Sequence, residues 1–478
     1  MGELKDKTLS GVKWNAIGRF STQGVSFVIS VLLARILSPS DYGVVGMIGI
    51  FMAIAQTFID SGFGSALIRK KDCTDVDFST AFYFNIVVGI VCYFILFFLA
   101  PLIADFFDTP ILRNIVRVLS INLFLGSLTI VQVAKLTAVV DFKSQAKIGL
   151  VSTIVSGCIG LLMAYSGYGV WSLVYQSVSA SVVRTILFWF VTKWRPQRIF
   201  SKHSFNYLFG FGSKILSASL LHTIYANLTT ILIGKFYTPR DLGYYSRGES
   251  LAKLPSSNFT GILQSVTYPI LSKIQDDDAR LISVYRKYIR ITSMVIFFGM
   301  FLMAALAEPL VITLFTDKWQ NSVIYLQVFC FNMMFDHLCQ LNLNILYVKG
   351  RSDLVLRLEV IKKIISILML IAAIPFGVLA ICISHALYTQ IAVIINTYYT
   401  GKLFGLGYWT QVKDFIKYLL FSFIAVLPAF ILSFTSLYPI AVLVLGGCSA
   451  SLIYWLFVRK DKGFVDLLDL VLKRRKRL

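Results

Sequence analysis

Long apolar segments follow one another along almost the whole chain, and no other feature limits its fold as strongly. Each is about 20 to 28 residues long, which is the length that a helix needs to cross roughly 30 Å of hydrocarbon. Hydrophobic residues make up 57% of the 478 residues and charged residues only 14%, so a water-soluble globule is excluded. The sequence therefore predicts an all-α, polytopic membrane protein with about fourteen transmembrane helices. These lie near residues 12–37, 43–68, 79–101, 112–139, 145–165, 169–192, 206–236, 242–271, 287–315, 320–348, 354–375, 377–400, 412–434 and 438–458.

The connections between the predicted spans alternate between strongly basic and nearly uncharged. Residues 69–71 and 193–202 are rich in Lys and Arg, whereas "SGYG", "PFG" and "TSLYP" carry no charge. Because basic loops stay on the cytoplasmic side, we expect both termini to be cytoplasmic. This asymmetry explains much of the net charge of +21 without a nucleic-acid partner. The final residues, "GFVDLLDLVLKRRKRL", fit either an interfacial helix on the anionic leaflet or a simple positive-inside stop signal.

One short motif occurs twice, 200 positions apart. "LSPSDYG" contains Pro39, Asp41 and Gly43, and "YTPRDLG" contains Pro239, Asp241 and Gly243. In each copy Pro and Asp favour a turn after a span, and Gly is expected to end the tight connection. Coincidence is the alternative, because turns of this composition are common.

The spacing of the two copies predicts the domain organisation. Six predicted spans separate them, which indicates two six-helix lobes in parallel repeat, followed by two further helices. We place the N-terminal lobe at residues 1–200, the C-terminal lobe at 201–405, spans 13 and 14 at 406–458, and a basic cytoplasmic tail at 459–478.

Several polar side chains fall inside the predicted spans, where charge is costly and commonly faces a cavity. Span 1 carries Asn15, Arg19, Thr22, Ser26 and Ser30 on one helical face, with Gln23 beside them. Asp60 lies inside span 2, whose small and polar residues fit a polar wall and a helix-packing seam equally well. The cations Arg19, Lys214 on span 7 and Arg247 on span 8 predict an anionic cargo, and the arginine fork suits phosphate. Snorkelling to the membrane surface is the alternative for each cation.

A polar face also crosses span 10. It is formed by Asn332, Asp336, Gln340 and Asn344, with His337 adjacent. Asp336 and the amides could bind Na⁺, His337 could relay a proton, or the whole face could be a hydrogen-bonded seam between helices.

Two longer stretches carry a family resemblance. "DSGFGSALIRKKD" (60–72) and "YYSRGESLAKLPSSNFTGILQSVTYPILSKIQDD" (244–277) resemble the Wzx-type polysaccharide flippases of the MOP superfamily, which are related to lipid II flippases. The resemblance implies a bacterial cytoplasmic-membrane protein that inverts a polyprenyl-diphosphate-linked oligosaccharide by alternating access through a cavity between two lobes. It implies that Arg19 and Arg247 engage the head group, and that a groove beside spans 13 and 14 holds the lipid tail. Sugar contacts would be spread over side chains such as Tyr225.

Other functions are less well supported by the sequence. A cation or drug antiporter of the same superfamily should carry acidic residues in its lumen, and a membrane glycosyltransferase or polymerase should present a large outer domain. No catalytic arrangement, nucleotide-binding loop or metal-ligand spacing is found in the sequence. We therefore expect a non-enzyme without a metal or cofactor, driven by Na⁺ or H⁺. Its expected partners are the lipid-linked glycan, the bilayer and the polysaccharide polymerase or export machinery.

Overall fold

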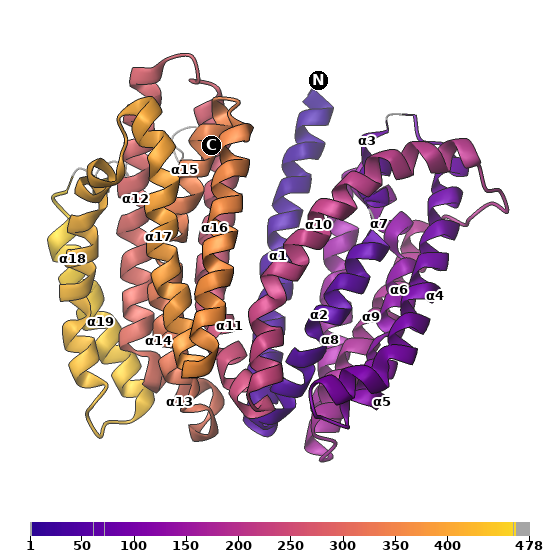
Figure 1. Cartoon of the computed structure of the whole chain (residues 1–478), viewed down its shortest axis with the longest axis horizontal. Coiled ribbons are helices and arrows are strands. Elements are labelled where there is room, and N and C mark those ends of the chain that lie inside the picture. Colours follow the sequence, from indigo (N-terminus) through magenta and orange to yellow (C-terminus); the bar gives the residue numbers. More distant parts are fainter. Residues whose placement is uncertain (1, 61, 71, 462, 465–478) are drawn as a thin grey trace. The chain divides into compact units, whose positions relative to one another are not determined.

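Every secondary-structure element in the described residues is a helix. The computed structural model describes residues 2–60, 62–70, 72–461, 463 and 464 (Figure 1). The expected all-α class is confirmed. The chain divides into two compact units, Met1–Gly243 and Tyr244–Leu478. The predicted lobe boundaries stay a prediction, and the tail hypothesis for residues 465–478 lies outside the described residues.

The first unit contains the helices of predicted spans 1 to 7. Helix α1 packs along α8, α8 along α9, and α10 against α2, α3 and α4. The helices are α1 (Gly2–Ile36), α2 (Pro39–Asp60), α3 (Phe63–Arg69), α4 (Asp75–Phe106), α5 (Leu112–Leu119), α6 (Ile121–Ser127), α7 (Ile130–Ala138), α8 (Phe142–Tyr165), α9 (Val170–Thr192) and α10 (Lys202–Phe236). Helix α11 (Pro239–Ser272) begins in this unit and continues into the second.

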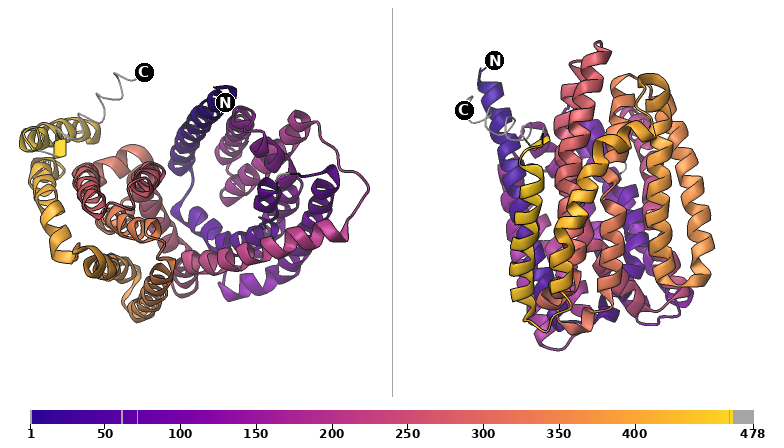
Figure 2. Two further views of the ribbon diagram at one scale, coloured as in Figure 1. Left: turned by 90° about the horizontal axis from the view of Figure 1, so that it is seen from above. Right: turned by 90° about the vertical axis from the view of Figure 1, so that its left-hand side faces the viewer.

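The second unit contains the remaining helices. Helix α12 packs against α18, α18 against α19, and α17 against both α14 and α16; Figure 2 shows α18 and α19 side by side in orange and yellow. The helices are α12 (Asp278–Ala305), α13 (Ala307–Phe315), α14 (Ser322–Met333), α15 (Asp336–Val348), α16 (Ser352–Ala373), α17 (Val378–Phe404), α18 (Tyr408–Leu432) and α19 (Pro439–Val458).

Twelve helical segments of the described chain are long and apolar enough to cross a membrane. The protein is therefore a multi-pass membrane protein, as expected. The two other predicted spans coincide with α11 and α16, which are long helices that carry more charge, including Arg247 and Lys362. The count of fourteen spans stays a prediction.

Predicted span 4 is not one continuous helix. It is divided into α5, α6 and α7, with breaks at Ser120 and around Thr129. The Ser120 hydroxyl donates to the carbonyl oxygen of Val116, and the Thr129 hydroxyl donates to that of Gly126. A hydroxyl bond of this kind also occurs inside a continuous helix, as at Ser152 of α8, so these bonds accompany the breaks without accounting for them.

The repeated motif forms the same helix start twice. Pro39 and Pro239 are the first residues of α2 and α11, where a missing N–H costs nothing. The Asp41 carboxylate accepts from the Ser38 N–H at 2.8 Å and the Ser38 hydroxyl at 2.6 Å. Asp241 accepts from the N–H and hydroxyl of Thr238 at 3.2 and 2.6 Å. Each Asp backbone N–H is directed back to the hydroxyl, which completes a reciprocal cap.

The motif glycines do not end the connecting turns, so that expectation is wrong. Gly43 and Gly243 lie in the second turn of their helices, where the starts of α2 and α11 cross. A Cβ on Gly43 would lie 1.6 Å from the carbonyl oxygen of Pro239, and one on Gly243 would lie 1.9 Å from that of Pro39. The two copies therefore pack reciprocally against each other, and glycine is required for that approach.

Helix α18 is joined to the other helices of the second unit by buried and part-buried polar contacts. The Asp414 carboxylate of α18 accepts from Arg286 Nε at 2.7 Å and from its terminal nitrogen at 3.0 Å, and Arg290 lies 3.6 Å away. Gln411 of α18 and Asn342 of α15 exchange two hydrogen bonds, at 3.0 and 2.8 Å. These contacts fix α18 against α12 and α15.

Candidate functional site

A polar cavity lies between α1 and α8 in the first unit. It has a volume of about 470 Å³ and contains Arg19 and Gln23. Helices α1 and α8 approach closely at one point, because a Cβ on Gly18 would lie 2.4 Å from that of Ala146. The structure thus brings together most of the polar face predicted for span 1, while Ser30 does not line the cavity. The lining residues are Asn15, Gly18, Arg19, Thr22, Gln23, Ser26, Phe142, Gln145, Ala146, Gly149 and Arg184.

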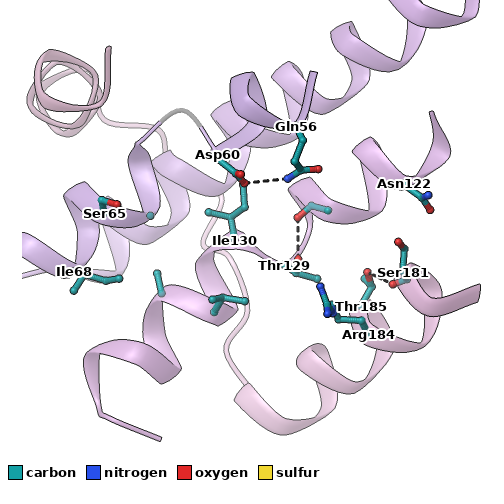
Figure 3. A pocket seen from close by; sticks show the side chains of 14 residues that line it. Gln56, Asp60, Ser65, Ile68, Asn122, Thr129, Ile130, Ser181, Arg184 and Thr185 are labelled. Carbon is teal, nitrogen blue, oxygen red and sulfur yellow. Dashed lines mark hydrogen bonds between the residues drawn. The ribbon is translucent and has the colours of Figure 1, made fainter. Parts of the chain in front are cut away.

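A second polar cavity, also of about 470 Å³, lies among α2, α3, α6, α7 and α9 (Figure 3). Gln56 donates from Nε2 to Oδ1 of Asp60 at 3.0 Å, one turn apart on α2. Opposite them, α9 contributes Ser181, Arg184 and Thr185. The position of Asp60 on the lining of this cavity favours a polar wall over a helix-packing seam.

Arg184 is the residue that these two cavities share. It is exposed and lies within α9, about 12 Å along the helix from the end at Thr192. Among the described residues it forms no hydrogen bond or ion pair. Arg184 is not among the site residues that the sequence predicted. The available signal was an arginine well inside an apolar segment, as at Arg19.

Arg19 and Arg184 give the cavity between α1 and α8 its charge. Both side chains are exposed, and no acidic residue is among those lining this cavity. Within the described chain, Arg19 likewise has no ion pair. Two guanidinium groups without a carboxylate attract an anion, and phosphate suits their forked donors best. The cavity can therefore bind a phosphate group without any covalent chemistry.

The other predicted cargo residues of the first unit lie elsewhere. Lys214 and Tyr225 belong to α10 and line neither cavity. Lys214 is exposed, which is compatible with snorkelling, and Tyr225 is half-buried. Their proposed contacts with cargo stay predictions.

Arg247 is packed differently from Arg19. It belongs to the second unit, is only 8% exposed, and lies against two aromatic rings. Its guanidinium carbon is 4.8 Å from the ring centre of Phe315 and 5.0 Å from that of Trp319. These cation–π contacts stabilise a buried arginine. A joint clamp with Arg19 stays a prediction.

The polar face of span 10 makes hydrogen bonds to neighbouring helices. Asp336 accepts from the Ser256 hydroxyl of α11 at 3.3 Å. His337 Nε2 lies 2.8 Å from the Ser293 hydroxyl of α12, with both side chains buried. Asn344 donates to Thr267 at 3.3 Å, and Thr389 donates to Asn332. This pattern fits the interhelical seam, while ion coupling by Asp336 and His337 stays a prediction.

A largely apolar cavity of about 220 Å³ lies between α12 and α19 in the second unit. Tyr454 forms one wall by stacking on Phe298, with ring centres 4.3 Å apart. The other lining residues are Met294, Val295, Ser451, Trp455, Val458 and Phe464. This cavity is suited to hydrocarbon and adjoins the second of the two C-terminal helices.

The apolar helices define a multi-pass membrane protein whose first unit contains two polar cavities. Residues 32–324 match the family described as "Polysaccharide biosynthesis protein". Because this match covers more than half of the chain, the chain belongs to that family. The expected membership in a polysaccharide biosynthesis family is confirmed, while the flippase role and the MOP superfamily stay predictions.

Relatives and solved structures agree with this assignment. The teichuronic acid biosynthesis protein TuaB of Bacillus subtilis (strain 168) is 25% identical over 74% of this chain and 74% of its own. The lipopolysaccharide biosynthesis protein WzxC of Escherichia coli (strain K12) is 25% identical over 82% of this chain and 80% of its own. The lipid II flippase MurJ, in an inward closed conformation, shares the fold with a TM-score of 0.76 and 14% identity, over 95% of this chain and 99% of MurJ.

Proposed function

We propose that the protein is a flippase that moves a polyprenyl-diphosphate-linked oligosaccharide from the inner to the outer leaflet by alternating access. The observation that carries this proposal is the cavity between α1 and α8, in which Arg19 and Arg184 lie without an acidic residue. Such a site favours an anionic head group over a cationic drug. The relatives add support, since TuaB is named for teichuronic acid biosynthesis, WzxC for lipopolysaccharide biosynthesis and MurJ as a lipid II flippase.

The head group and the tail of the proposed cargo need different environments, and this chain offers both. A diphosphate with attached sugars cannot enter hydrocarbon, whereas the isoprenoid tail need not leave it. The protein has to shelter only the head group, for which the two polar cavities of the first unit supply charge and hydrogen bonds. The cavity between α12 and α19 offers the tail an apolar surface.

The proposal includes a location and an energy source. We place the protein in a bacterial cytoplasmic membrane with both termini inside, working beside the polysaccharide polymerase or export machinery. A Na⁺ or H⁺ gradient would drive the cycle, with Asp336 and His337 as the candidate coupling residues. Transport, and no chemical conversion of the glycan, is the proposed activity.

The test compares Arg19 variants in cells. Outer-leaflet appearance of the lipid-linked oligosaccharide should fall in the order wild type, Arg19→Lys, Arg19→Ala, because lysine keeps the charge but loses the fork. A charge-assisted hydrogen bond of roughly 1.5–3 kcal/mol predicts about a tenfold to hundredfold loss of head-group affinity in the alanine variant. Arg113→Gln, at an exposed position on α5 outside both cavities, serves as the control.

Two results would count against the proposal. One is normal flipping by Arg19→Ala at wild-type abundance in the membrane. The other is efflux of a cationic dye by the wild-type protein without any effect on the glycan, which would favour the cation antiporter.

A further inference from the structure

The cavity around Asp60 combines groups that no single phosphate would satisfy. Asp60 and Gln56 of α2 stand on one side and Arg184 of α9 on the other, and Ser181 supplies a hydroxyl (Figure 3). No ion pair joins Asp60 to Arg184 within the described residues, although both line the same cavity. Each therefore remains available to a ligand.

We infer that this cavity is the subsite for the sugar nearest the diphosphate, with Asp60 and Gln56 binding its hydroxyls. In the same inference Arg184 holds the adjoining phosphate at the junction with the cavity of Arg19. The assignment rests on the proposed function, and it adds a sugar-binding site and an arginine that the sequence did not reveal.

The charges determine which part of the head group lies where. A phosphate beside Asp60 would be repelled, because two like charges would share one cavity. A sugar hydroxyl can instead donate to the carboxylate and to the amide oxygen of Gln56, since the Gln56 amide nitrogen already donates to Asp60. The acid thus directs the phosphate towards Arg184 and the neutral sugar towards α2.

The cavity volume of about 470 Å³ provides the room for a sugar ring. Gly126 of α6 lines the cavity, and a Cβ there would lie 3.5 Å from the amide oxygen of Gln56. Asn122, which also lines it, donates to Ser177 of α9 at 2.9 Å, so this wall is held in place by a contact between helices. A positioned wall of amides and hydroxyls is typical of sites that recognise sugars by hydrogen bonds.

The experiment measures binding of two lipids to purified full-length protein in nanodiscs. One lipid is undecaprenyl diphosphate, and the other is the lipid-linked oligosaccharide extracted from a strain that lacks the flippase. Wild type should bind the glycosylated lipid at least about tenfold more tightly. Asp60→Asn, which keeps an oxygen for Gln56, should abolish this preference and leave undecaprenyl diphosphate affinity within about twofold or improved.

Arg184→Gln provides the complementary result. It should weaken binding of both lipids by about tenfold. Arg184→Lys should weaken this binding less, and Arg113→Gln should leave it unchanged. Thermal unfolding of every variant verifies that the fold is kept. The subsite is refuted if folded Asp60→Asn retains the full preference for the glycosylated lipid, or if Arg184→Gln binds both lipids as wild type does. Failure of the wild-type protein to bind either lipid would overturn the proposed function itself.

Discussion

Replacing Gly43 by alanine should destabilise the first unit, because the new methyl group has no space. Its Cβ would lie 1.6 Å from the carbonyl oxygen of Pro239 and 2.5 Å from the carbonyl carbon. Both are backbone atoms at a helix start, so they cannot rotate away as a side chain would. Overpacking typically costs about 1–3 kcal/mol, and we expect the upper end of that range.

The same helix offers a matched control. Gly49 also lies in α2, and a Cβ there would meet no atom within 4 Å. Gly49→Ala should be neutral or stabilising by up to about 1 kcal/mol, because alanine is the better helix former. The two variants add the same methyl group to one helix, so their difference isolates the crossing with α11.

The assay is thermal unfolding of purified protein in detergent, followed by far-UV circular dichroism. At roughly 2–4 °C per kcal/mol, Gly43→Ala should lower the apparent Tm by about 6 °C or more, and Gly49→Ala should not lower it. Gly243→Ala should behave like Gly43→Ala, since its Cβ would lie 1.9 Å from the oxygen of Pro39. Equal Tm values for wild type, Gly43→Ala and Gly243→Ala would refute the reciprocal packing of the two motifs.

Three further predictions concern the second unit. Asp414→Ala should lower stability by about 2 kcal/mol, measured by thermal unfolding, because it leaves Arg286 and Arg290 without their acid; an unchanged Tm would contradict this. Burial alone would raise the pKa of Asp461, but hydrogen bonds from Lys417, Tyr418 and the Gly463 N–H lower it below its usual value. The stabilisation that the Asp461 carboxylate provides is therefore full above its unfolded pKa of about 3.9, and it is lost as pH falls through its lower pKa in the folded protein. Wild type and Asp461→Asn should therefore differ in Tm near neutral pH and have the same Tm in strong acid. Asp336→Asn should remove the dependence of flipping on the ion gradient while keeping the fold, and full gradient-driven flipping would end the coupling role.

Several helices were predictable from continuous apolar segments, although predicted spans 2, 4, 9 and 10 are each divided into shorter helices. Segments such as α8 and α9 agree with their predicted ranges, because length and hydropathy alone determine a membrane span. The division of span 4 into α5, α6 and α7 was not predictable in this way, because the breaks leave the hydropathy of the segment unchanged.

The candidate site was predictable only in part. The helical spacing from Asn15 to Ser26 placed one wall of a cavity correctly, because residues three and four apart share a face. The contribution of Arg184 depends on how α9 packs beside α6 and α8, which no spacing within one helix encodes. The close approach of Gly43 to Pro239 was not predictable for the same reason, because these two residues meet only in the folded chain.

Reconstitution of the purified protein measures translocation of the glycan itself. Purified protein is placed in liposomes with the lipid-linked oligosaccharide, and a membrane-impermeant glycosidase reports how much glycan crosses to the outer leaflet with time. We expect wild type to transfer the glycan much faster than it crosses protein-free liposomes, and Arg19→Ala to slow transfer by about tenfold to a hundredfold. Transfer by the wild-type protein at the protein-free rate, under an imposed Na⁺ or H⁺ gradient, would contradict this expectation.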